Sequence, residues 1–553
     1  MTTIVCMRGF LASSIGVTCA AALALPLTLP SADAAAATGV PGVPGADERL
    51  GANVEPATTT GPATDAGSGV GARPAVGGKP GAKSLTGVKP GAQSLTGAKP
   101  GAKPLTGAKP GAGAKPGARG RPAADSLSGT TRSLPLVPLD GPDRAGDTGR
   151  PQGLTRHDVA PFSLLGVVWD DPEAELHGSV QVRTRATGGT AWSAWQNLEA
   201  HNHEHAADPG TAERESGRVR GSTAPLWVGD SDGVEVRVRP APREPGQPGQ
   251  PGQPGQPGQG GQHGQDGRDT GPRLPTGLRL ELVDPGEEPP PGGTPADVPR
   301  ANSLTTASAA ASAVNADLAP LGAPLIPELT KAQTEADLLT ALGLPNTTAA
   351  RPYIGPRPAI VTRRGWGADE RLRERDFAYT KTVKAAFLHH TVTGNKYRCS
   401  QAPSVLRSIY RYHVKSSGWR DIGYNFAIDK CGNIYEGRAG GVAKPVLGAH
   451  TLGFNTNSMG IAVIGTYTSA PPPKAAVNAV ARLTAWKLGL FGANPRGKTY
   501  LKSGGGNLYR KGTKVRLHVI SGHRDGFATE CPGRRLYGKL GTARATSARL
   551  QGR

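Results

Sequence analysis

The sequence predicts an α/β domain at the end of the chain, a small antiparallel β-domain before it, and long linkers. Three observations predict this arrangement. First, the 553 residues include 79 glycines and 51 prolines, about twice the usual share, so much of the chain lacks a core. Second, short runs of alternating apolar and polar residues occur in 162–286, as in half-buried strands. Third, strand and helix patterns are mixed in 362–541, as in α/β domains.

Residues 1–34 have the features of a secretory signal peptide. Arg8 is the only charged residue before an apolar stretch, and Ala32-Asp33-Ala34 supplies the small residues of a cleavage site. We therefore expect a secreted protein, extracellular or associated with the cell wall, in a compartment that permits disulfides. Nucleic acid is then not an expected partner. After residue 34 there is no run of ~18 consecutive apolar residues. We therefore expect no transmembrane segment after signal cleavage.

The linkers are expected where apolar side chains are scarce. Residues 35–161 contain no aromatic residue, and a ten-residue repeat starts at Lys79, Lys89, Lys99 and Lys109. Such a segment cannot bury enough surface to offset the entropy of ordering, so we expect a flexible linker. A second linker, rich in proline and alanine, is expected over 287–361, with one helix near 329–342. Residues 542–553 are expected to be a tail.

The β-domain is predicted over 162–286. Val180 and Val182 alternate with polar residues, and four tryptophans supply an aromatic core: Trp169, Trp192, Trp195 and Trp227. A Gln-Pro-Gly run between residues 243 and 266 cannot pair in a sheet and is expected to be a surface loop. The histidines at 201, 203 and 205 can bind metal. Their polar surroundings, without cysteine or clustered acids, instead favour a solvated loop.

The α/β domain is predicted over 362–541, long enough to hold its own core. The alternation in 382–391 predicts a strand with His389 on the same face as Phe387. Helical spacing of apolar residues predicts helices at 403–414 and 474–491. Short apolar runs predict further strands at 425–428, 459–464 and 515–520.

The positive charge of the chain is concentrated in this domain. Residues 362–541 contain 30 lysines and arginines but 9 aspartates and glutamates, whereas the remaining residues contain 34 of each. A strongly basic surface favours a polyanionic partner. In an exported protein, anionic polymers of the cell wall are the expected partner of this kind.

Three residues of the α/β domain form a candidate zinc site. His389 ends a predicted strand, and His523 and Cys531 lie in a stretch of glycine and proline that can fold both onto one ion. Catalytic zinc has three protein ligands and an open position, where its charge acidifies a bound water. The spacing alone leaves a structural role of these histidines open.

Seven motifs, in order, resemble the peptidoglycan recognition protein family within the type 2 N-acetylmuramoyl-L-alanine amidases. They cover about 180 residues, a third of the chain, and concern none of residues 35–300. The matching residues are Arg364-Gly365-Trp366-Gly367-Ala368, Leu388-His389-His390-Thr391 with Tyr412-His413, Gly418-Trp419-Arg420-Asp421-Ile422-Gly423-Tyr424-Asn425-Phe426, Tyr435-Glu436-Gly437-Arg438, Gly448-Ala449-His450, Asn457-Ser458-Met459-Gly460-Ile461, and Gly522-His523-Arg524-Asp525 with Cys531-Pro532-Gly533.

The resemblance implies a central mixed β-sheet flanked by helices, with Zn²⁺ at the bottom of a groove. It also implies roles for named residues: His389, His523 and Cys531 as zinc ligands, Tyr424 and Thr529 as catalytic hydrogen-bond donors, and Gly418, Trp419, Arg438 and His450 as substrate-binding residues. For His450, substrate contact and a structural role are equally open. Gly418-Trp419 and Arg438 accompany a preference for diaminopimelate-type peptidoglycan in the family, since arginine can grip a carboxylate with two hydrogen bonds.

The cysteines complete the implied site. With Cys531 assigned to zinc, Cys399 and Cys431 are the remaining pair after signal cleavage, and we expect a disulfide between them. One departure from the family is Ala439-Gly440-Gly441, where glycine and tryptophan usually follow the Glu-Gly-Arg motif, so one groove wall is expected to differ.

The function expected from this resemblance is a secreted, monomeric zinc amidase. It would hydrolyse the amide between the lactyl group of N-acetylmuramic acid and the L-alanine of the stem peptide. The alternative is a non-catalytic peptidoglycan-binding protein of the same fold, but family members that only bind typically lack the cysteine ligand. A wall-anchored structural protein, acting through its β-domain and linkers, would leave the metal triad unexplained.

Overall fold

The computed structural model describes residues 129–139, 150–200, 203–242, 273–287, 304–346 and 351–553. The predicted signal peptide, the lysine repeat and the Gln-Pro-Gly run therefore lie outside the described residues. All described residues belong to one compact unit, Ala112–Arg553. None of the helices in these ranges is both long and apolar enough to span a membrane.

The predicted β-domain is confirmed as an antiparallel sheet of nine strands. The order of its main path is β1-β9-β4-β8-β3-β2, while β5 and β6 extend from β8 and β7 pairs with β4. The strands are β1 (Thr131–Pro135), β2 (Val137–Pro138), β3 (Gln152–Arg156), β4 (Phe162–Trp169), β5 (Gly178–Ala186), β6 (Gln196–Leu198), β7 (Gly221–Ser222), β8 (Leu226–Pro240) and β9 (Arg279–Val283).

This domain begins earlier than the sequence predicts. Strands β1 to β3 lie inside the region expected to be linker up to residue 161. Strand β1 pairs with β9, β3 pairs with β8, and β2 pairs with β3. Leu136 and Leu154 bury their side chains in the domain core. The prediction failed because it searched for aromatic residues, whereas a strand that pairs with an existing sheet needs only a few aliphatic side chains to be held.

The tryptophans are also placed differently from the prediction. Trp169 is in the β-domain core and 2% exposed, but Trp192 and Trp195 are only half-buried. The guanidinium group of Arg237 lies 4.0 Å from the ring centroid of Trp195, within the range of a cation–π contact. The core is therefore mainly aliphatic, and two tryptophans pack under arginines instead.

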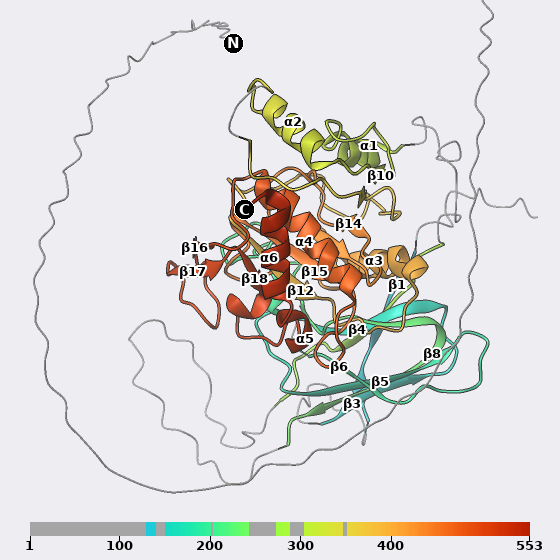
Figure 1. Ribbon diagram of the computed structural model, residues 1–553. Coiled ribbons are helices and arrows are strands. Elements are labelled where there is room, and N and C mark those ends of the chain that lie inside the picture. The colour runs from blue at the N-terminus through green and yellow to red at the C-terminus, as the bar shows by residue number, and fades with distance from the viewer. Residues whose placement is uncertain (1–128, 140–149, 201–202, 243–272, 288–303, 347–350) are drawn as a thin grey trace, which may run out of the picture. The chain divides into compact units, whose positions relative to one another are not determined.

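The second sheet has seven strands in mixed orientation, as the fold class predicts (Figure 1). Strand β12, next to the edge of the sheet, runs parallel to both of its neighbours, β15 and β18. In order across the sheet, the strands are β10 (Leu325–Ile326), β11 (Ile360–Val361), β14 (Ile434–Glu436), β13 (Phe426–Ile428), β15 (Ser458–Val463), β12 (Ala385–His390) and β18 (Ile520–Gly522). A separate hairpin joins β16 (Lys498–Lys502) and β17 (Lys514–His518), so the single strand expected at 515–520 is divided between two sheets.

Helices cover both faces of the mixed sheet. On one face, α4 (Lys474–Gly489) and α6 (Leu540–Gln551) bury Leu483, Trp486 and Leu540 against strand residues. On the other face lies α3 (Ala402–Arg411), which continues into the π-helical turn η4 (Tyr412–Ser416). The helices expected at 403–414 and 474–491 are confirmed. A further short helix, α5 (Arg534–Tyr537), precedes α6.

Two segments expected to be irregular belong to the α/β fold. In the second linker, α1 (Thr306–Ala313) and β10 precede the predicted helix, α2 (Lys331–Ala341), and β10 pairs with β11. The expected tail is instead the greater part of α6. Its small residues Ala543 and Ala548 are buried, because alanine lets α6 lie close to α4. These corrections extend the domain on both sides of the predicted range.

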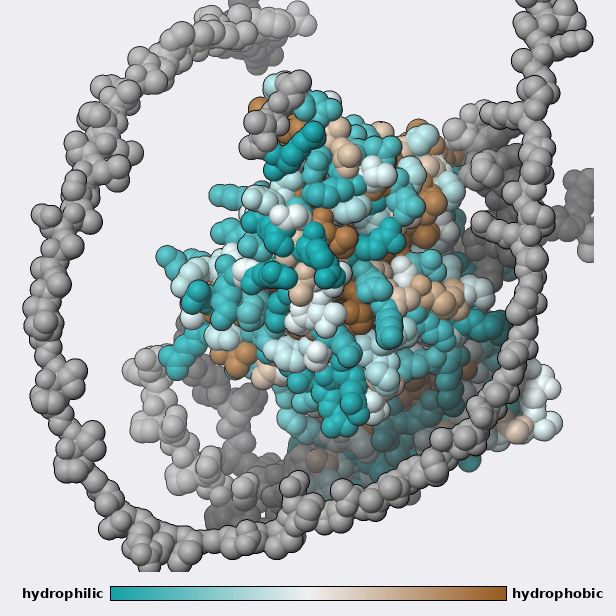
Figure 2. All heavy atoms as spheres, viewed as in Figure 1, coloured by the Kyte–Doolittle hydropathy of each residue, from teal (hydrophilic) through white to brown (hydrophobic). Residues whose placement is uncertain are grey.

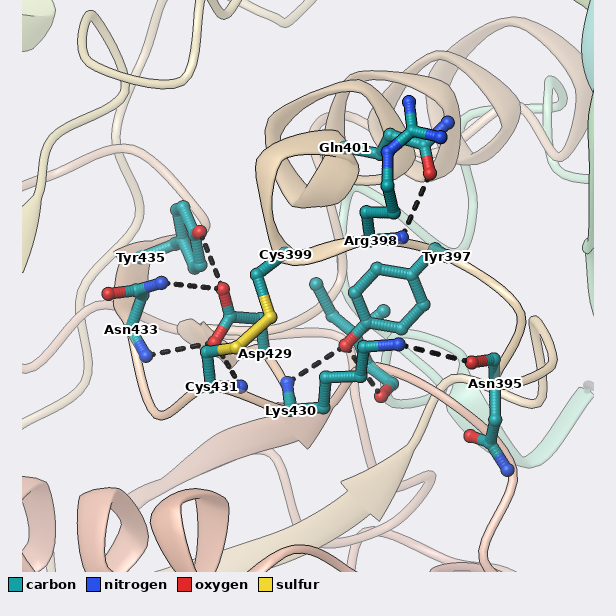
Figure 3. The surroundings of a disulfide bond; sticks show 11 residues. Asn395, Tyr397, Arg398, Cys399, Gln401, Asp429, Lys430, Cys431, Asn433 and Tyr435 are labelled. Carbon is teal, nitrogen blue, oxygen red and sulfur yellow. Dashed lines mark hydrogen bonds between the residues drawn. A yellow bond between two sulfur atoms is a disulfide. The ribbon is translucent and has the colours of Figure 1, made fainter.

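The predicted disulfide between Cys399 and Cys431 is present, with the two Cα atoms 6.2 Å apart. It joins the 3-10 turn before α3 to the turn between β13 and β14. Figure 3 shows that Asp429 organises this second turn. Its carboxylate accepts hydrogen bonds from the backbone of Cys431 and Asn433 and from the hydroxyl of Tyr435.

The two domains share a buried interface. Leu164, Val168 and Val283 of the β-domain belong to the same apolar cluster as residues of α3. The Tyr412 hydroxyl donates to the backbone oxygen of Thr223 at 3.1 Å. This interface holds the β-domain against the α3 side of the α/β domain.

Candidate metal centre and substrate groove

Four potential metal ligands meet in one buried cluster. Three come from the α/β domain: His389, His523 and Cys531. The fourth is His205, at the end of the 3-10 turn η1 (His203–His205) of the β-domain. All four ligand atoms lie within 4.8 Å of one another. The Cys531 sulfur lies 3.7 Å from His205 Nε2 and 3.7 Å from His389 Nδ1.

The mixed sheet explains why the first three residues meet. His389 lies near the end of β12, and the next strand, β18, runs parallel to it with Gly522 opposite Leu388. His523 follows Gly522 directly, so the two imidazoles come from the same end of neighbouring strands. The chain then turns back, and the Arg524 amide donates to the carbonyl of Cys531 at 3.0 Å. This turn brings the sulfur to the histidines.

The cluster has the chemistry of a zinc site. Burial lowers the pKa of His389 and His523 well below the usual value, and it lowers the pKa of His205 to about 3. The imidazoles are therefore neutral, which is the form that binds metal. Burial raises the pKa of the Cys531 thiol, and only a cation next to the sulfur would favour the thiolate.

Two geometric observations support the same fit. Zinc bonds of ~2.1 Å to nitrogen and ~2.3 Å to sulfur at tetrahedral angles place the two ligand atoms about 3.6 Å apart, close to the observed 3.7 Å. Both ring nitrogens of His523 are buried, and no side chain among the described residues forms a hydrogen bond with them. Buried polar atoms rarely stay unpaired, and a metal would satisfy one of them.

His205 corrects the prediction of a solvated histidine loop. Its side chain is 4% exposed, and its ring centroid lies 4.5 Å from that of His523. His203 is half-buried outside the cluster, and residue 201 lies outside the described residues. The prediction considered only the local sequence, in which no cysteine or acid cluster accompanies the histidines. The ligand partners of His205 are more than 180 residues away.

The two predicted catalytic donors lie beside the cluster. The Tyr424 ring is 5.5 Å from that of His389, and burial raises its pKa well above 10, so the phenol keeps its proton. Thr529 accepts a hydrogen bond from the Cys531 amide, and its hydroxyl donates to Glu204 of the β-domain at 3.1 Å. Both residues line a cavity of about 540 Å³ together with Cys531.

The predicted substrate-binding residues of one groove wall are covered by the β-domain. Arg438 is 5% exposed and donates two hydrogen bonds, of 2.8 and 2.9 Å, to the carboxylate of Glu213. Gly418 has φ +76, and a Cβ there would lie 1.9 Å from the Arg218 carbonyl oxygen. The cavities beside Arg438 have volumes of about 10 Å³. This part of the groove is therefore filled.

The other predicted groove residues have structural contacts. Trp419 is 4% exposed and packs on the ring of His413, with ring centroids 4.3 Å apart. His450 is fully buried behind His389 and contacts the Thr451 hydroxyl through Nδ1. In the described conformation His450 has packing contacts, and its contact with substrate stays a prediction.

Comparisons with known proteins identify two regions of the chain. Residues 379–534 match the N-acetylmuramoyl-L-alanine amidase family. Residues 118–258 match the Rv3811 N-terminal galactose-binding domain-like family, which agrees with an all-β domain that begins before residue 162. The first match contains His389, His523 and Cys531, and the second contains His205.

Individual relatives cover the α/β domain. Peptidoglycan-recognition protein SC2 of Drosophila simulans is 33% identical over 185 residues, 33% of this chain and 85% of the relative. The N-acetylmuramoyl-L-alanine amidase of Homo sapiens is 33% identical over 190 residues, 34% of this chain and 28% of that protein. A solved structure of peptidoglycan recognition protein-LE in complex with tracheal cytotoxin is 29% identical and covers 33% of this chain and 92% of that chain, with a TM-score of 0.27.

The sequence matches agree with the motifs in residues 362–541. The names of these relatives refer to peptidoglycan recognition and to N-acetylmuramoyl-L-alanine amidase. Through its α/β domain, the chain belongs to the family of peptidoglycan recognition proteins and type 2 N-acetylmuramoyl-L-alanine amidases.

Proposed function

We propose that the protein is a secreted, zinc-dependent amidase that hydrolyses the amide between N-acetylmuramic acid and L-alanine in peptidoglycan. The observation that carries this proposal is the group formed by His389, His523 and Cys531, with Tyr424 and Thr529 at the adjoining cavity. Family members that only bind typically lack the cysteine. Secretion is proposed from the features of residues 1–34 alone.

The chemistry follows from the positions of these side chains. Zinc held by His389, His523 and Cys531 would supply a Lewis acid and an acidified water at neutral pH. The Tyr424 phenol is neutral and lies beside His389, so it can donate a hydrogen bond to the oxygen that becomes negative during attack on the amide. Thr529 can supply a second donor when it is released from Glu204. One such donor contributes about 3–4 kcal/mol.

The proposed stem peptide carries diaminopimelate. Arg438 lies on the groove wall and already holds a carboxylate through two hydrogen bonds. Diaminopimelate differs from lysine by one added carboxylate, and a planar guanidinium binds that group with a geometry that lysine cannot reproduce. We expect faster cleavage of diaminopimelate-type than of lysine-type muropeptides. Arg438→Lys should reduce this preference, and equal wild-type rates on both substrates would refute it.

The basic surface is proposed to hold the enzyme on anionic wall polymers. Hydrophilic side chains dominate the face of the molecule in Figure 2, and the hydrophobic residues form small separate spots. Charges at such a surface are screened within ~8 Å at physiological salt. Adsorption to purified walls should therefore weaken as salt is added while zinc stays bound. Adsorption that does not depend on salt would point to recognition of sugars.

Purified sacculi provide the decisive experiment. Mass spectrometry of the digest should detect free stem peptides with an L-alanine amino terminus and unmodified glycan strands. Their absence, with binding to the sacculi intact, would favour the alternative of a non-catalytic peptidoglycan-binding protein. The fourth ligand, His205, gives that alternative specific support, because a zinc site with four protein ligands leaves no position for water.

A further inference from the structure

The segment that crosses the groove is residues 203–219 of the β-domain, called the groove segment below. We propose that it is a built-in occupant of the peptidoglycan site. In this state His205 completes a closed metal centre with four protein ligands, and Glu213 takes the position of a substrate carboxylate at Arg438. The inference rests on the proposed function. It implies that the described conformation is inactive as an amidase until the groove segment leaves.

The first support is the position of His205 relative to the other ligands. Its Nε2 lies 3.7 Å from the Cys531 sulfur, and its ring centroid lies 5.2 Å from that of His389 and 4.5 Å from that of His523. Zinc sites with four protein ligands are structural, whereas hydrolytic sites keep one position for water. His205 fills the position that a hydrolase would leave open.

The same turn also occupies a catalytic hydrogen-bond donor. Glu204 precedes His205, and its carboxylate accepts the hydrogen bond that the Thr529 hydroxyl donates at 3.1 Å. The Glu204 carbonyl in turn accepts from the amide of Leu452 at 2.9 Å. A single turn of the β-domain therefore engages both the metal cluster and one of the two donors proposed for catalysis.

The second support lies at the other end of the groove segment. Both carboxylate oxygens of Glu213 accept hydrogen bonds from Arg438, and Oε1 also accepts from the Arg420 amide at 3.2 Å. The side chains of Glu213 and Arg438 are 7% and 4% exposed. A carboxylate of the stem peptide would make the same contacts with Arg438, so Glu213 and the substrate compete for one site.

The contacts between these two ends are mostly hydrogen bonds and therefore exchangeable, and the buried apolar residues there are two alanines, Ala206 and Ala207. Asp208 accepts hydrogen bonds from the Gly453 amide at 2.8 Å and from the Asn455 side chain at 2.7 Å. None of the described residues of the groove segment belongs to an apolar core cluster. Water and substrate can replace such hydrogen bonds at modest net cost, so the segment can leave without unfolding either domain.

The metal arm of the test uses the full-length protein loaded with Co²⁺ and titrated with azide. In the wild type, azide should leave the visible spectrum unchanged because every ligand position is filled. His205→Ala should open one position, so azide should shift the spectrum. His203→Ala is the matched control, since this histidine lies in the same turn but outside the cluster, and it should behave as the wild type. An equal response of wild type and His205→Ala would overturn the inference.

A second experiment tests competition in the groove and does not depend on metal. Glu213→Gln should weaken the hold of the groove segment on Arg438, and a fluorescent diaminopimelate-containing tetrapeptide should bind about tenfold more tightly, since a larger fraction of the protein is competent to bind. Glu215→Gln, an exposed position in the same segment, is the control. Equal affinity of wild type and Glu213→Gln would refute competition at Arg438, even if His205→Ala failed to fold.

Hydrolysis separates this inference from the proposed function. If the inference holds, His205→Ala should cleave muropeptides about tenfold faster than wild type or more, because the water position is no longer filled. Loss of hydrolysis in His205→Ala with the fold intact would refute the claim that the groove segment blocks the site. His205 would then take part in the reaction. If no variant hydrolyses but azide still distinguishes His205→Ala from wild type, the groove segment remains an occupant and the amidase proposal fails.

Discussion

The α/β domain and the groove segment hold their metal ligands by different means. His389 and His523 extend from neighbouring buried strands, β12 and β18, whose backbone positions are fixed by parallel pairing. His205 extends from one 3-10 turn, in which Glu204 accepts hydrogen bonds from Thr529 and Leu452 of the α/β domain. Packed strands open only at a large fraction of the global unfolding free energy, whereas segments with few buried apolar contacts open at a lower free energy. The sheet thus fixes the ligands of the α/β domain, whereas His205 can leave the metal and be replaced by water or substrate.

The largest expected effect tests this contrast at the metal. Cys531→Ser should lower zinc affinity by at least ~100-fold and abolish zinc-dependent hydrolysis, because a hydroxyl is a far weaker ligand than a thiolate. His205→Ala should keep the three remaining ligands and bind zinc much more tightly than Cys531→Ser. Zinc content after dialysis against a chelator measures both. Full zinc content and activity in Cys531→Ser would remove Cys531 from the ligand set.

The disulfide should strengthen the α/β domain without affecting the groove segment. Cys399 and Cys431 are 32 positions apart, and closing a loop of that length stabilises a protein by roughly 3–4 kcal/mol in the chain-entropy model. Replacing both cysteines with serine should lower the free energy of unfolding in urea by about this amount. The response of the Co²⁺ protein to azide should stay that of the wild type. An unchanged free energy of unfolding would show that the disulfide does not stabilise the folded protein.

How far the sequence predicted each region follows from the range of the interactions involved. The mixed sheet and its metal ligands could be predicted from the sequence. Alternation of apolar and polar residues indicates β12, and the ordered motifs contain His389, His523 and Cys531. The role of His205 depends on contacts with residues more than 180 positions away, and its neighbours are those of a solvated loop. Local composition cannot report that kind of contact.

The same reasoning explains the boundaries that were missed. Strands β1 and β3 contain few apolar residues and depend on pairing with β9 and β8, and α6 depends on burial of alanines against α4. Each needs a partner surface that is formed by distant residues. Residues 1–128, with the signal peptide and most of the first linker, lie outside the described ranges, so their predictions stand as made.

A pH-dependent effect is expected where the second linker joins the α/β sheet. Glu436 of β14 accepts a hydrogen bond from Asn315 at 2.9 Å, and burial raises its pKa from 4.5 to about 7. The folded protein therefore holds a proton that the unfolded chain releases between these values, and the contribution of Glu436 to stability falls as pH rises through that window. A shift of this size corresponds to about 3 kcal/mol.

Glu436→Gln should remove this part of the pH dependence. Unfolding in urea at pH 4.5 and pH 8 would measure the difference, with the exposed Glu328→Gln as the matched control. Buried histidines with lowered pKa values, such as His205, raise stability over the same interval in all three proteins, so the prediction concerns the difference between variants. The wild type and the control should change alike, and Glu436→Gln should change by about 3 kcal/mol more favourably between pH 4.5 and pH 8. Equal changes in all three proteins would show that Glu436 ionises in the folded state as it does in the unfolded chain.

The smallest expected effect concerns the interface that carries the groove segment to its site. The hydroxyl of Tyr412 donates to the Thr223 carbonyl at 3.1 Å and lies 3.4 Å from the Val167 carbonyl. Tyr412→Phe keeps the ring but leaves a buried carbonyl without this donor, which should cost about 1–2 kcal/mol. Tyr500→Phe, at a position 59% exposed, should change stability by less than about 0.5 kcal/mol.

Because the groove segment is attached through this interface, Tyr412→Phe should also increase the azide response of the Co²⁺ protein slightly. Lower stability without any change in that response would show that the groove segment is held by its own contacts with the groove.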